Sequence, residues 1–268
     1  MRRRLDTELV RRGLVSSRDR AQAEISAGRV MVRGVPATKA ARMVDADDPV
    51  ALQGPGPRFV SRGGDKLDAA LDRFGIEVAG RAALDAGAST GGFTDCLLQR
   101  GAAHVVAVDV GRGQLDLRLR DDERVTVRER TNVRHLVPAD AGGPFELIVA
   151  DLAFISLRTV APALLGLAAP GADLVLLVKP QFEAGRVEAS RERGVIRDPL
   201  VWRQALDGVV ATFAAGGAAI MGLMVSPLLG AEGNVEFLAH LVAGAPPTAD
   251  PVALVAGALD AATAHRDA

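Results

Sequence analysis

The stretch of this 268-residue chain with the clearest capacity for chemistry is the glycine-rich sequence LDAGASTGGFT, from Leu84 to Thr94. It follows a short apolar run and opens a helical segment, so its glycines would let the backbone approach a ligand at a helix N-terminus. It lacks the Gly-Lys-Ser/Thr ending of a P-loop and is not a strict G-x-G-x-x-G. An acid at the strand end with Gly-x-x-x-Gly-Gly after it favours a cationic nucleoside such as S-adenosylmethionine, although a dinucleotide or a purely structural turn stays open. The expected cofactor-binding residues are Asp85, Gly87, Ala88, Ser89, Thr90, Gly91, Gly92 and Phe93.

A second acid ends the next apolar run. Asp109 stands 24 positions after Asp85, close to the offset of about 20 residues at which an acid reaches a ribose diol in doubly wound nucleotide folds. We therefore expect Asp109, with Val110 beside it, to bind the adenosine part of a cofactor. The alternative is that Asp109 only caps its strand.

Two later apolar runs end in Asp151 and Lys179. Open α/β sheets bind their ligands at this edge, so both side chains should face a cleft. A lysine beside carboxylates can position a hydroxyl or accept its proton. The structural alternatives are that Asp151 caps the next helix and that Lys179 extends its ammonium group to solvent. The single cysteine, Cys96, excludes an internal disulfide and a cysteine-based zinc cluster, and we expect no metal.

The elements that would carry these residues follow from the apolar pattern. Short apolar runs alternate with helical segments, which predicts an α/β fold with a mostly parallel sheet between two helical layers. The runs are 82–86, 104–110, 125–129, 145–152 and 173–180. Two last runs, 220–228 and 234–242, are joined by a short glycine-containing loop over 229–233, and they predict a terminal antiparallel hairpin at the sheet edge.

The uncharged stretch 209–231 is 23 residues long, which is enough on paper to cross a bilayer. Gly216, Gly217 and Pro227 interrupt it, so we expect a helix end, a turn and a buried strand instead.

The N-terminal segment differs from the rest of the chain in charge. Residues 1–42 contain eleven Arg or Lys and four acids, a net charge of +7, which leaves −8 for the remainder. This asymmetry is typical of a polyanion-binding appendage, although a solvated basic face is the plainer alternative. The apolar spacing predicts a short helix from Leu5 that Gly13 ends. A second helix over 18–27 would be capped by Ser16 or Ser17 and stopped by Gly28, and a hairpin would turn at Arg33-Gly34. The residues expected to contact the polyanion are Arg4, Arg11, Arg18, Arg20, Arg29, Arg33, Lys39 and Arg62.

The Pro- and Gly-rich segment 53–58 indicates a linker. We expect a small α+β domain over 1–54, a linker over 55–60, the catalytic domain over 61–246 and a helical tail over 247–268.

Several motifs together resemble a known family, the TlyA-type rRNA 2'-O-methyltransferases, historically called haemolysin A and related to the FtsJ/RrmJ-like methyltransferases. The resemblance covers nearly the whole chain. It is carried by VSRGGDKL at 60–67, LDAGASTGGFTDCLL at 84–98, VDVGRGQL at 108–115, ERTNVR at 129–134, VADLAFISL at 149–157 and LVKPQFE at 177–183. It implies an S-four-type RNA-binding domain, a Rossmann-like methyltransferase domain, and a charged version of a Gly-rich loop at 185–194. It also implies a catalytic tetrad of Lys66, Asp151, Lys179 and Glu236.

The resemblance further implies S-adenosylmethionine-dependent methylation of cytidine 2'-hydroxyls in 16S and 23S rRNA. Ribosomal subunits would be the partner, without metal or stable membrane association. The chemistry is reasonable because a ribose hydroxyl is a weak acid that must be oriented and relieved of its proton. No secretion signal is evident, since charges follow the basic start, and we expect a cytoplasmic protein. A membrane-active haemolysin and a non-catalytic ribosome-binding factor are the alternatives. With no Tyr and one Trp, the composition argues against a base-stacking platform.

Overall fold

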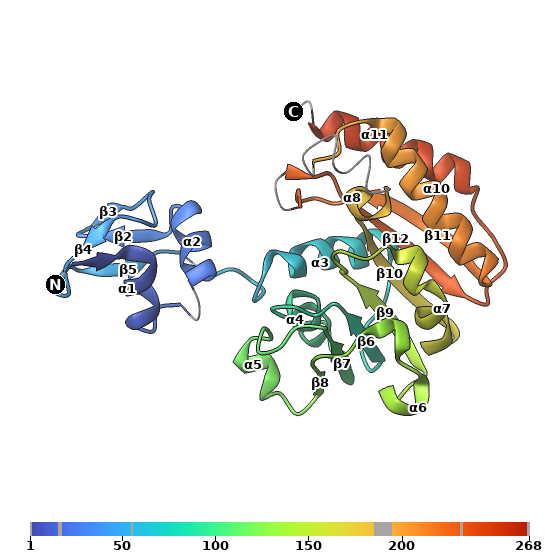
Figure 1. Ribbon diagram of the computed structural model, residues 1–268, viewed down its shortest axis with the longest axis horizontal. Coiled ribbons are helices and arrows are strands. Elements are labelled where there is room, and N and C mark those ends of the chain that lie inside the picture. The colour runs from blue at the N-terminus through green and yellow to red at the C-terminus, as the bar shows by residue number, and fades with distance from the viewer. Residues whose placement is uncertain (1, 16–17, 55, 185–194, 231–232, 267–268) are drawn as a thin grey trace. The chain divides into compact units, whose positions relative to one another are not determined.

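The structure is a computed structural model that describes residues 2–15, 18–54, 56–184, 195–230 and 233–266. The chain forms two compact units, Met1–Arg58 and Phe59–Ala268 (Figure 1). The division falls inside the segment that we expected to be the linker. The Ser16 or Ser17 helix cap, the charged loop at 185–194 and the tip of the 229–233 loop lie outside the described residues.

The first unit packs two helices against short strands. Apolar residues spaced four apart, Leu5 and Leu9 on the first helix and Ala21 and Ile25 on the second, are all buried in one core. The predicted helices are present but shorter, as α1 (Leu5–Arg11) and α2 (Arg18–Ser26). The predicted hairpin is confirmed, because β2 (Val30–Val32) pairs antiparallel with β3 (Val35–Pro36). The pairing of β1 (Arg3–Arg4) with β4 (Met43–Val44) and of β5 (Val50–Leu52) with β2 was not predicted.

The second unit contains a seven-stranded sheet in the order β11-β12-β10-β9-β6-β7-β8. The five strands from β6 to β10 run parallel, which confirms the predicted α/β class. They are β6 (Ala82–Ala86), β7 (His104–Val108), β8 (Val125–Arg128), β9 (Phe145–Ala150) and β10 (Ala168–Val178). The predicted terminal hairpin is also confirmed, since β11 (Ala218–Val225) at the sheet edge runs antiparallel to β12 (Phe237–Ala243).

Helices cover both faces of this sheet (Figure 1). Neighbouring strand residues point to opposite faces, so Ala83 packs in one hydrophobic core and Leu84 in the other. The first core includes helices α3 (Arg62–Phe74) and α4 (Gly92–Gln99). The second includes α7 (Leu157–Leu167), α10 (Pro199–Ala215) and α11 (Pro251–Arg266). Shorter helical turns lie at α5 (Leu117–Arg120), η1 (Val133–His135), α6 (Pro138–Ala141) and α8 (Pro180–Glu183).

The described part of the uncharged stretch, residues 209–230, includes the end of α10, a turn at Gly216-Gly217 and strand β11, as the sequence predicts. Gly217 adopts a φ of 88°, a conformation that glycine accepts readily. Within the described residues, no helix has both the length and the apolar character needed to span a membrane. Helix α11 packs on β11 and α10, and it buries Val255 and Leu259 in the second unit's core.

Candidate active site

The glycine-rich loop joins β6 to α4. At two of its glycines the backbone lies so close to neighbouring backbone atoms that a side chain would not fit. Gly87 has a φ of 88°, and a Cβ added there would lie 2.5 Å from the carbonyl oxygen of Asp151. A Cβ on Gly92 would lie 2.8 Å from the backbone nitrogen of Gly64. The loop is therefore fixed between β9 on one side and α3 on the other, with the start of α4 facing the space between them.

A cavity of about 260 Å³ lies at this loop. Its lining combines the start of α3, the loop and the end of β9: Ser61, Arg62, Gly63, Lys66, Gly87, Ala88, Ser89, Thr90, Gly92, Phe93 and Asp151. A much smaller pocket shares Ala88 and Ser89 with it and extends toward Asp109 and Gln114. Because a glycine loop, a helix start and carboxylates meet here, the residues fit a cationic nucleoside cofactor.

The cofactor residues expected from the sequence differ in whether they line the cavity. Six of them line the cavity, namely Gly87, Ala88, Ser89, Thr90, Gly92 and Phe93. Gly91 lines neither pocket, because the side chains of Leu115 and Leu119 press against it. Val110 is 68% exposed and also lines neither pocket.

Asp109 holds the loop from the neighbouring strand. Its carboxylate accepts hydrogen bonds from the backbone N–H groups of Ser89, at 2.9 Å, and Gly111, at 2.6 Å. It also lines the smaller pocket. The carboxylate therefore shapes the loop in addition to facing the pocket, so its substitution would disturb both.

Asp85 lies behind the loop and not in the cavity. Its side chain is fully buried, and its Oδ2 accepts a hydrogen bond of 2.6 Å from Thr94 Oγ1. Its Oδ1 has no hydrogen-bond partner among the described residues. Burial raises the pKa of Asp85 to about 7, against the opposing effect of the Thr94 hydrogen bond and with help from the nearby charges of Asp151 and Asp109.

The four residues of the implied tetrad form two ion pairs at the carboxyl end of the sheet. Lys66 Nζ, from α3, lies 2.5 Å from Glu236 Oε2, and both side chains are at least 92% buried. Lys179 Nζ lies 2.5 Å from Asp151 Oδ1, and this pair is more open, with side chains 13% and 25% exposed.

The strand register explains why the two pairs meet. Val178 is opposite Phe237 in the antiparallel pairing of β10 and β12, so Lys179 and Glu236 follow side by side. Strand β9 lies parallel on the other side of β10, with Ala150 opposite Leu176, which brings Asp151 to the same edge. Lys66 and Asp151 both line the cavity.

An exposed aromatic residue at this edge was not predicted. Phe154 is 92% exposed and adopts a φ of 63°, which is unusual for a bulky residue and often marks a functional loop. Its ring centroid lies 5.3 Å from that of Phe182, and Lys179 Nζ lies 5.9 Å from the Phe182 centroid. A low aromatic content argues against a base-stacking platform, but it does not indicate that one exposed ring lies at this edge.

A second unpredicted residue, Glu183, ties the segment after Lys179 to the loop that carries Phe154. The Glu183 carboxylate is buried at the start of α7, where it accepts hydrogen bonds from Ser156 Oγ, at 2.5 Å, and from the backbone N–H of Leu157, at 2.7 Å. A carboxylate is favourable at a helix N-terminus. The sequence signal was the LVKPQFE motif, but nothing in it indicated this contact.

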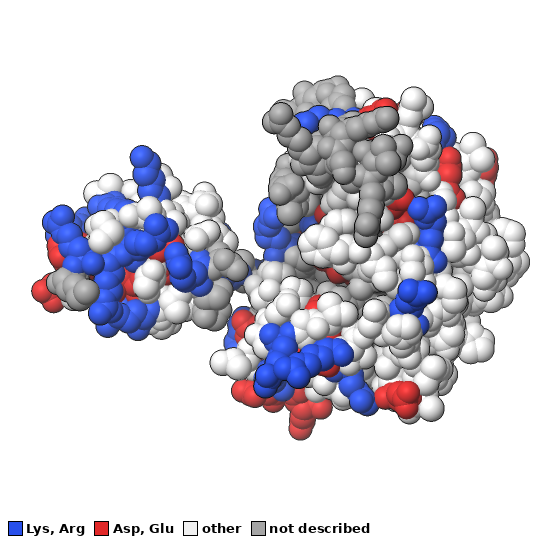
Figure 2. All heavy atoms as spheres, in the orientation of Figure 1, with Lys and Arg blue, Asp and Glu red and all other residues white. Residues whose placement is uncertain are grey.

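The expected RNA-binding residues lie mostly on the first unit. Figure 2 shows Lys and Arg gathered on the visible face of this unit. Six of the arginines form ion pairs with acids of the same unit: Arg4, Arg11, Arg18, Arg20, Arg29 and Arg33. Lys39 is exposed, and Arg62 is exposed at the cavity of the second unit. Among the described residues, no group of three or more His, Cys, Asp or Glu side chains could hold a metal ion.

Comparisons with known proteins agree over both units. Residues 59–243 match the family model of the FtsJ-like methyltransferase, and residues 3–50 match that of the S4 domain. The chain is 51% identical over 241 residues to the 16S/23S rRNA (cytidine-2'-O)-methyltransferase TlyA of Mycobacterium tuberculosis, covering 90% of each chain. It is 40% identical to Hemolysin A of Brachyspira hyodysenteriae, covering 89% of this chain and 99% of the relative.

A solved structure from Streptococcus thermophilus that bears a hemolysin name is also similar. Its TM-score is 0.77 at 38% identity, and the match covers 100% of this chain and 99% of that one. The chain therefore belongs to the TlyA-type branch of the FtsJ-like methyltransferase family.

Proposed function

We propose that this protein transfers a methyl group from S-adenosylmethionine to the ribose 2'-hydroxyl of cytidines in 16S and 23S ribosomal RNA. The observation that carries the proposal is the meeting of the Lys66–Glu236 and Lys179–Asp151 ion pairs beside the glycine-loop cavity. The named activity of the M. tuberculosis relative supports the same substrate and position.

The cavity residues would hold the cofactor. Thr90, Gly92 and Phe93 place the start of α4 at the cavity, where backbone N–H groups favour a carboxylate. Asp151 offers negative charge to an ammonium or sulfonium group, and Asp109 lies toward the smaller pocket, where a ribose diol would fit. When bound, S-adenosylmethionine supplies an electrophilic methyl group on a cationic sulfur, so the chain itself needs no metal for this step.

The protein's own task is to position and activate the hydroxyl. The Lys179 ammonium is held by Asp151 and is partly accessible, so it can donate a hydrogen bond that orients the hydroxyl oxygen. In its neutral form the same amine can accept the hydroxyl proton. Lys66 and Glu236 neutralise each other beside this pair, which limits the net charge that the buried edge must accommodate.

Phe154 would contribute to holding the nucleoside. The exposed ring packs against Phe182, which in turn lies near Lys179 Nζ, and it offers a surface on which a base can stack. Stacking contributes about 1 to 3 kcal/mol per base. The methyl-accepting ribose would then lie near the ion pairs. The basic first unit, an S4 domain by its family match, would bind folded ribosomal RNA by its phosphates.

The deciding experiment is mass-spectrometric mapping of ribosomal RNA. RNA from cells that lack the protein would be incubated with S-adenosylmethionine and either the wild type or Lys179→Ala. We expect new 2'-O-methylcytidines with the wild type only. An unmethylated RNA with the wild type, under conditions where calorimetry shows cofactor binding, would contradict the proposal.

The two other candidate functions have separate tests. A membrane-active haemolysin would release dye from liposomes, whereas we expect no release from detergent-free protein. A non-catalytic ribosome-binding factor would not bind S-adenosylmethionine, whereas the glycine loop predicts that this protein does. We also propose that it acts in the cytoplasm, where ribosomal subunits are found.

A further inference from the structure

The first unit is the most basic part of the chain, yet four of its acids are buried, namely Asp48 and three acids on helices. Asp6 and Glu8 on α1 and Glu24 on α2 have exposed fractions of 0%, 1% and 3%. Each of them forms ion pairs with two arginines: Asp6 with Arg4 and Arg18, Glu8 with Arg11 and Arg12, and Glu24 with Arg20 and Arg29. Isolated charges are costly to bury, so these acids depend on their arginines.

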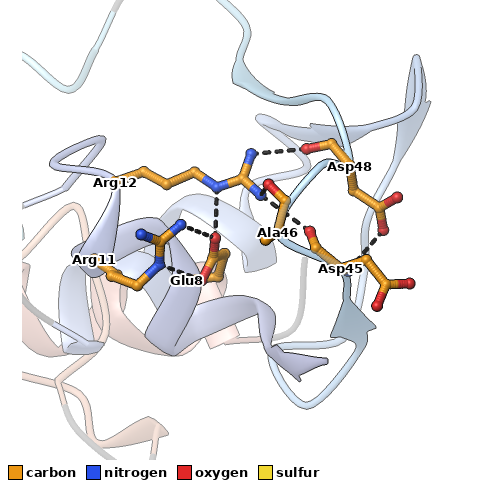
Figure 3. Close-up of polar contacts among 6 residues, drawn as sticks. All are labelled: Glu8, Arg11, Arg12, Asp45, Ala46 and Asp48. Atoms are coloured by element: carbon orange, nitrogen blue, oxygen red, sulfur yellow. Dashed lines mark hydrogen bonds and ion pairs between the residues drawn. The ribbon is translucent and has the colours of Figure 1, made fainter. Parts of the chain in front are cut away.

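The Glu8 group shows how such an acid fixes an arginine (Figure 3). Arg11 donates from Nε to Oε2 at 2.8 Å and from Nη2 to Oε1 at 2.6 Å, which is a bidentate contact. Arg12 donates from Nε to Oε1 at 2.7 Å. These contacts lower the pKa of Glu8 to about 2, with the Arg11 hydrogen bonds as the largest cause. Glu8 is therefore ionised and fully engaged at neutral pH.

The two arginines that contact Glu8 differ in how many N–H donors they have left for a ligand. Arg12 also donates to three backbone carbonyls, those of Asp48 at 2.7 Å, Asp45 at 3.1 Å and Ala46 at 2.9 Å (Figure 3). Its side chain is only 19% exposed. Arg12 thus fastens α1 to the 45–48 turn and has little left for a ligand.

Arg11 has the opposite character. Its side chain is 47% exposed. A guanidinium group has five N–H donors, and within the described residues Glu8 occupies two of those of Arg11. Three donors remain on a group whose position is already fixed.

Asp6 repeats this arrangement with two exposed arginines. Arg4 contacts it through Nε at 3.1 Å and Nη2 at 2.8 Å, and Arg18 contacts it through Nη2 at 3.0 Å. The side chains of Arg4 and Arg18 are 45% and 56% exposed. Asp6 thereby links the start of α1 to the start of α2, and it holds Arg4 at the end of β1 and Arg18 on α2.

We propose that Asp6 and Glu8 are positioning residues for RNA binding, which hold Arg4, Arg11 and Arg18 with free donors directed to backbone phosphates. The proposal rests on the proposed function, because RNA is the partner. Arginine recognises phosphate through its fixed fork, and a side chain ordered before binding loses less entropy on binding. Removing either acid therefore weakens RNA binding, although it makes the protein more positive.

Net charge alone predicts that removal of an acid strengthens RNA binding, whereas the proposal predicts that it weakens RNA binding, so the two can be distinguished. Glu8→Gln removes one negative charge and the anchor of Arg11. Asp47→Asn is the matched control, since Asp47 is exposed on the same unit and forms no ion pair with any described residue. Both variants raise the net charge by one, but only Glu8→Gln releases an arginine.

Affinity for purified 23S ribosomal RNA would be measured over a salt series. Ordering one long side chain corresponds to a factor of roughly 2 to 10 in affinity, and we expect Glu8→Gln to bind that much more weakly than the wild type. Asp47→Asn should bind as tightly or slightly more tightly. Asp6→Asn should show the larger loss, because it releases two exposed arginines.

Arg11→Lys guards against a folding defect in the acid variants. It changes only an exposed side chain and keeps the charge, but it loses the bidentate contact, so we expect weaker binding. Arg3→Lys, an exposed residue without an ion pair among the described residues, should bind within a factor of two of the wild type. Equal or tighter RNA binding by folded Glu8→Gln, or unchanged binding by Arg11→Lys, would overturn the positioning role. A wild type that binds no ribosomal RNA would instead overturn the proposed function.

Discussion

Asp85 carries an unusual prediction about stability. Its pKa is raised from an ordinary value of 3.8 to about 7, chiefly by burial. Because the folded protein holds this proton more tightly than the unfolded chain, the contribution of Asp85 to the free energy of unfolding is largest below pH 4. This contribution is then lost as the pH rises to about 7. The shift of about three pH units corresponds to roughly 4 kcal/mol, at about 1.4 kcal/mol per unit.

Asp85→Asn imitates the protonated acid at every pH. The amide oxygen can keep the hydrogen bond from Thr94, and the buried Oδ1 position stays uncharged. The amide that replaces the acid lacks one hydrogen-bond partner, which costs about 1 to 3 kcal/mol at every pH. We therefore expect the variant to be no more stable than the wild type near pH 4.5. Above pH 7, where the wild type has lost the roughly 4 kcal/mol, the variant should be more stable by about 1 to 3 kcal/mol.

The assay is urea unfolding of both proteins between pH 4.5 and pH 8.5, followed by the fluorescence of Trp202, which is buried in the second unit. The quantity of interest is the difference in unfolding free energy between variant and wild type at each pH, in which the titrations of other groups cancel. Asp65→Asn, an exposed acid on α3, is the control and should give a flat difference. A flat difference for Asp85→Asn as well would refute the reasoning from burial.

The same variant tests the expectation that Asp85 binds the cofactor. Since its carboxylate is fully buried behind the loop, S-adenosylmethionine affinity at pH 7 should change by less than about fivefold, a change that corresponds to under 1 kcal/mol. A tenfold or greater loss of S-adenosylmethionine affinity would indicate that Asp85 does bind the cofactor.

The remaining predictions concern the active-site edge. Lys179→Ala should retain cofactor and RNA binding, while its methylation rate falls at least about 100-fold. Lys179→Arg keeps the charge but cannot readily accept a proton, so near-wild-type turnover of this variant in rate assays would exclude a base role and leave Lys179 only an electrostatic positioning role. Asp109→Ala should weaken S-adenosylmethionine binding by about 1 to 3 kcal/mol by calorimetry, because the loop loses its anchor and the pocket its acid, and unchanged affinity would contradict both roles. Phe154→Ala should raise KM for RNA or lower kcat at least about tenfold without loss of stability, whereas Phe154→Trp should restore activity if stacking is the reason. Glu183→Ala should lower the methylation rate and leave RNA affinity unchanged, and a rate equal to the wild type's would show that the tie between α7 and α8 is not needed.

The sequence alone was sufficient to predict the strands of the sheet. Strand β6 forms over the predicted run 82–86, and the other predicted runs form strands whose ends differ from the predicted ones by up to five residues. The parallel order and the terminal hairpin follow from patterns that are local in sequence, namely the alternation of apolar runs with helices and the short loop before β12. Helix α3 was not predicted. Its sequence RGGDKLDAALDRF has two glycines in the first turn that disfavour a helix, and burial of its apolar face against α4 and the sheet decides its structure.

The site shows the same division between local and distant information. The type and spacing of residues in the sequence, with the family resemblance, identified the glycine loop, Asp109 and the four tetrad residues. Only the tertiary structure decided that Lys66 pairs with Glu236, which is 170 positions away, and that Lys179 pairs with Asp151. Three other features could not be predicted from the sequence: the burial of Asp85, the exposure of Phe154 and the ion pair of Arg11 with Glu8. The physical reason is that the charge state, accessibility and partner of a side chain depend on what other elements pack around it, whereas apolar periodicity is recorded within each element itself.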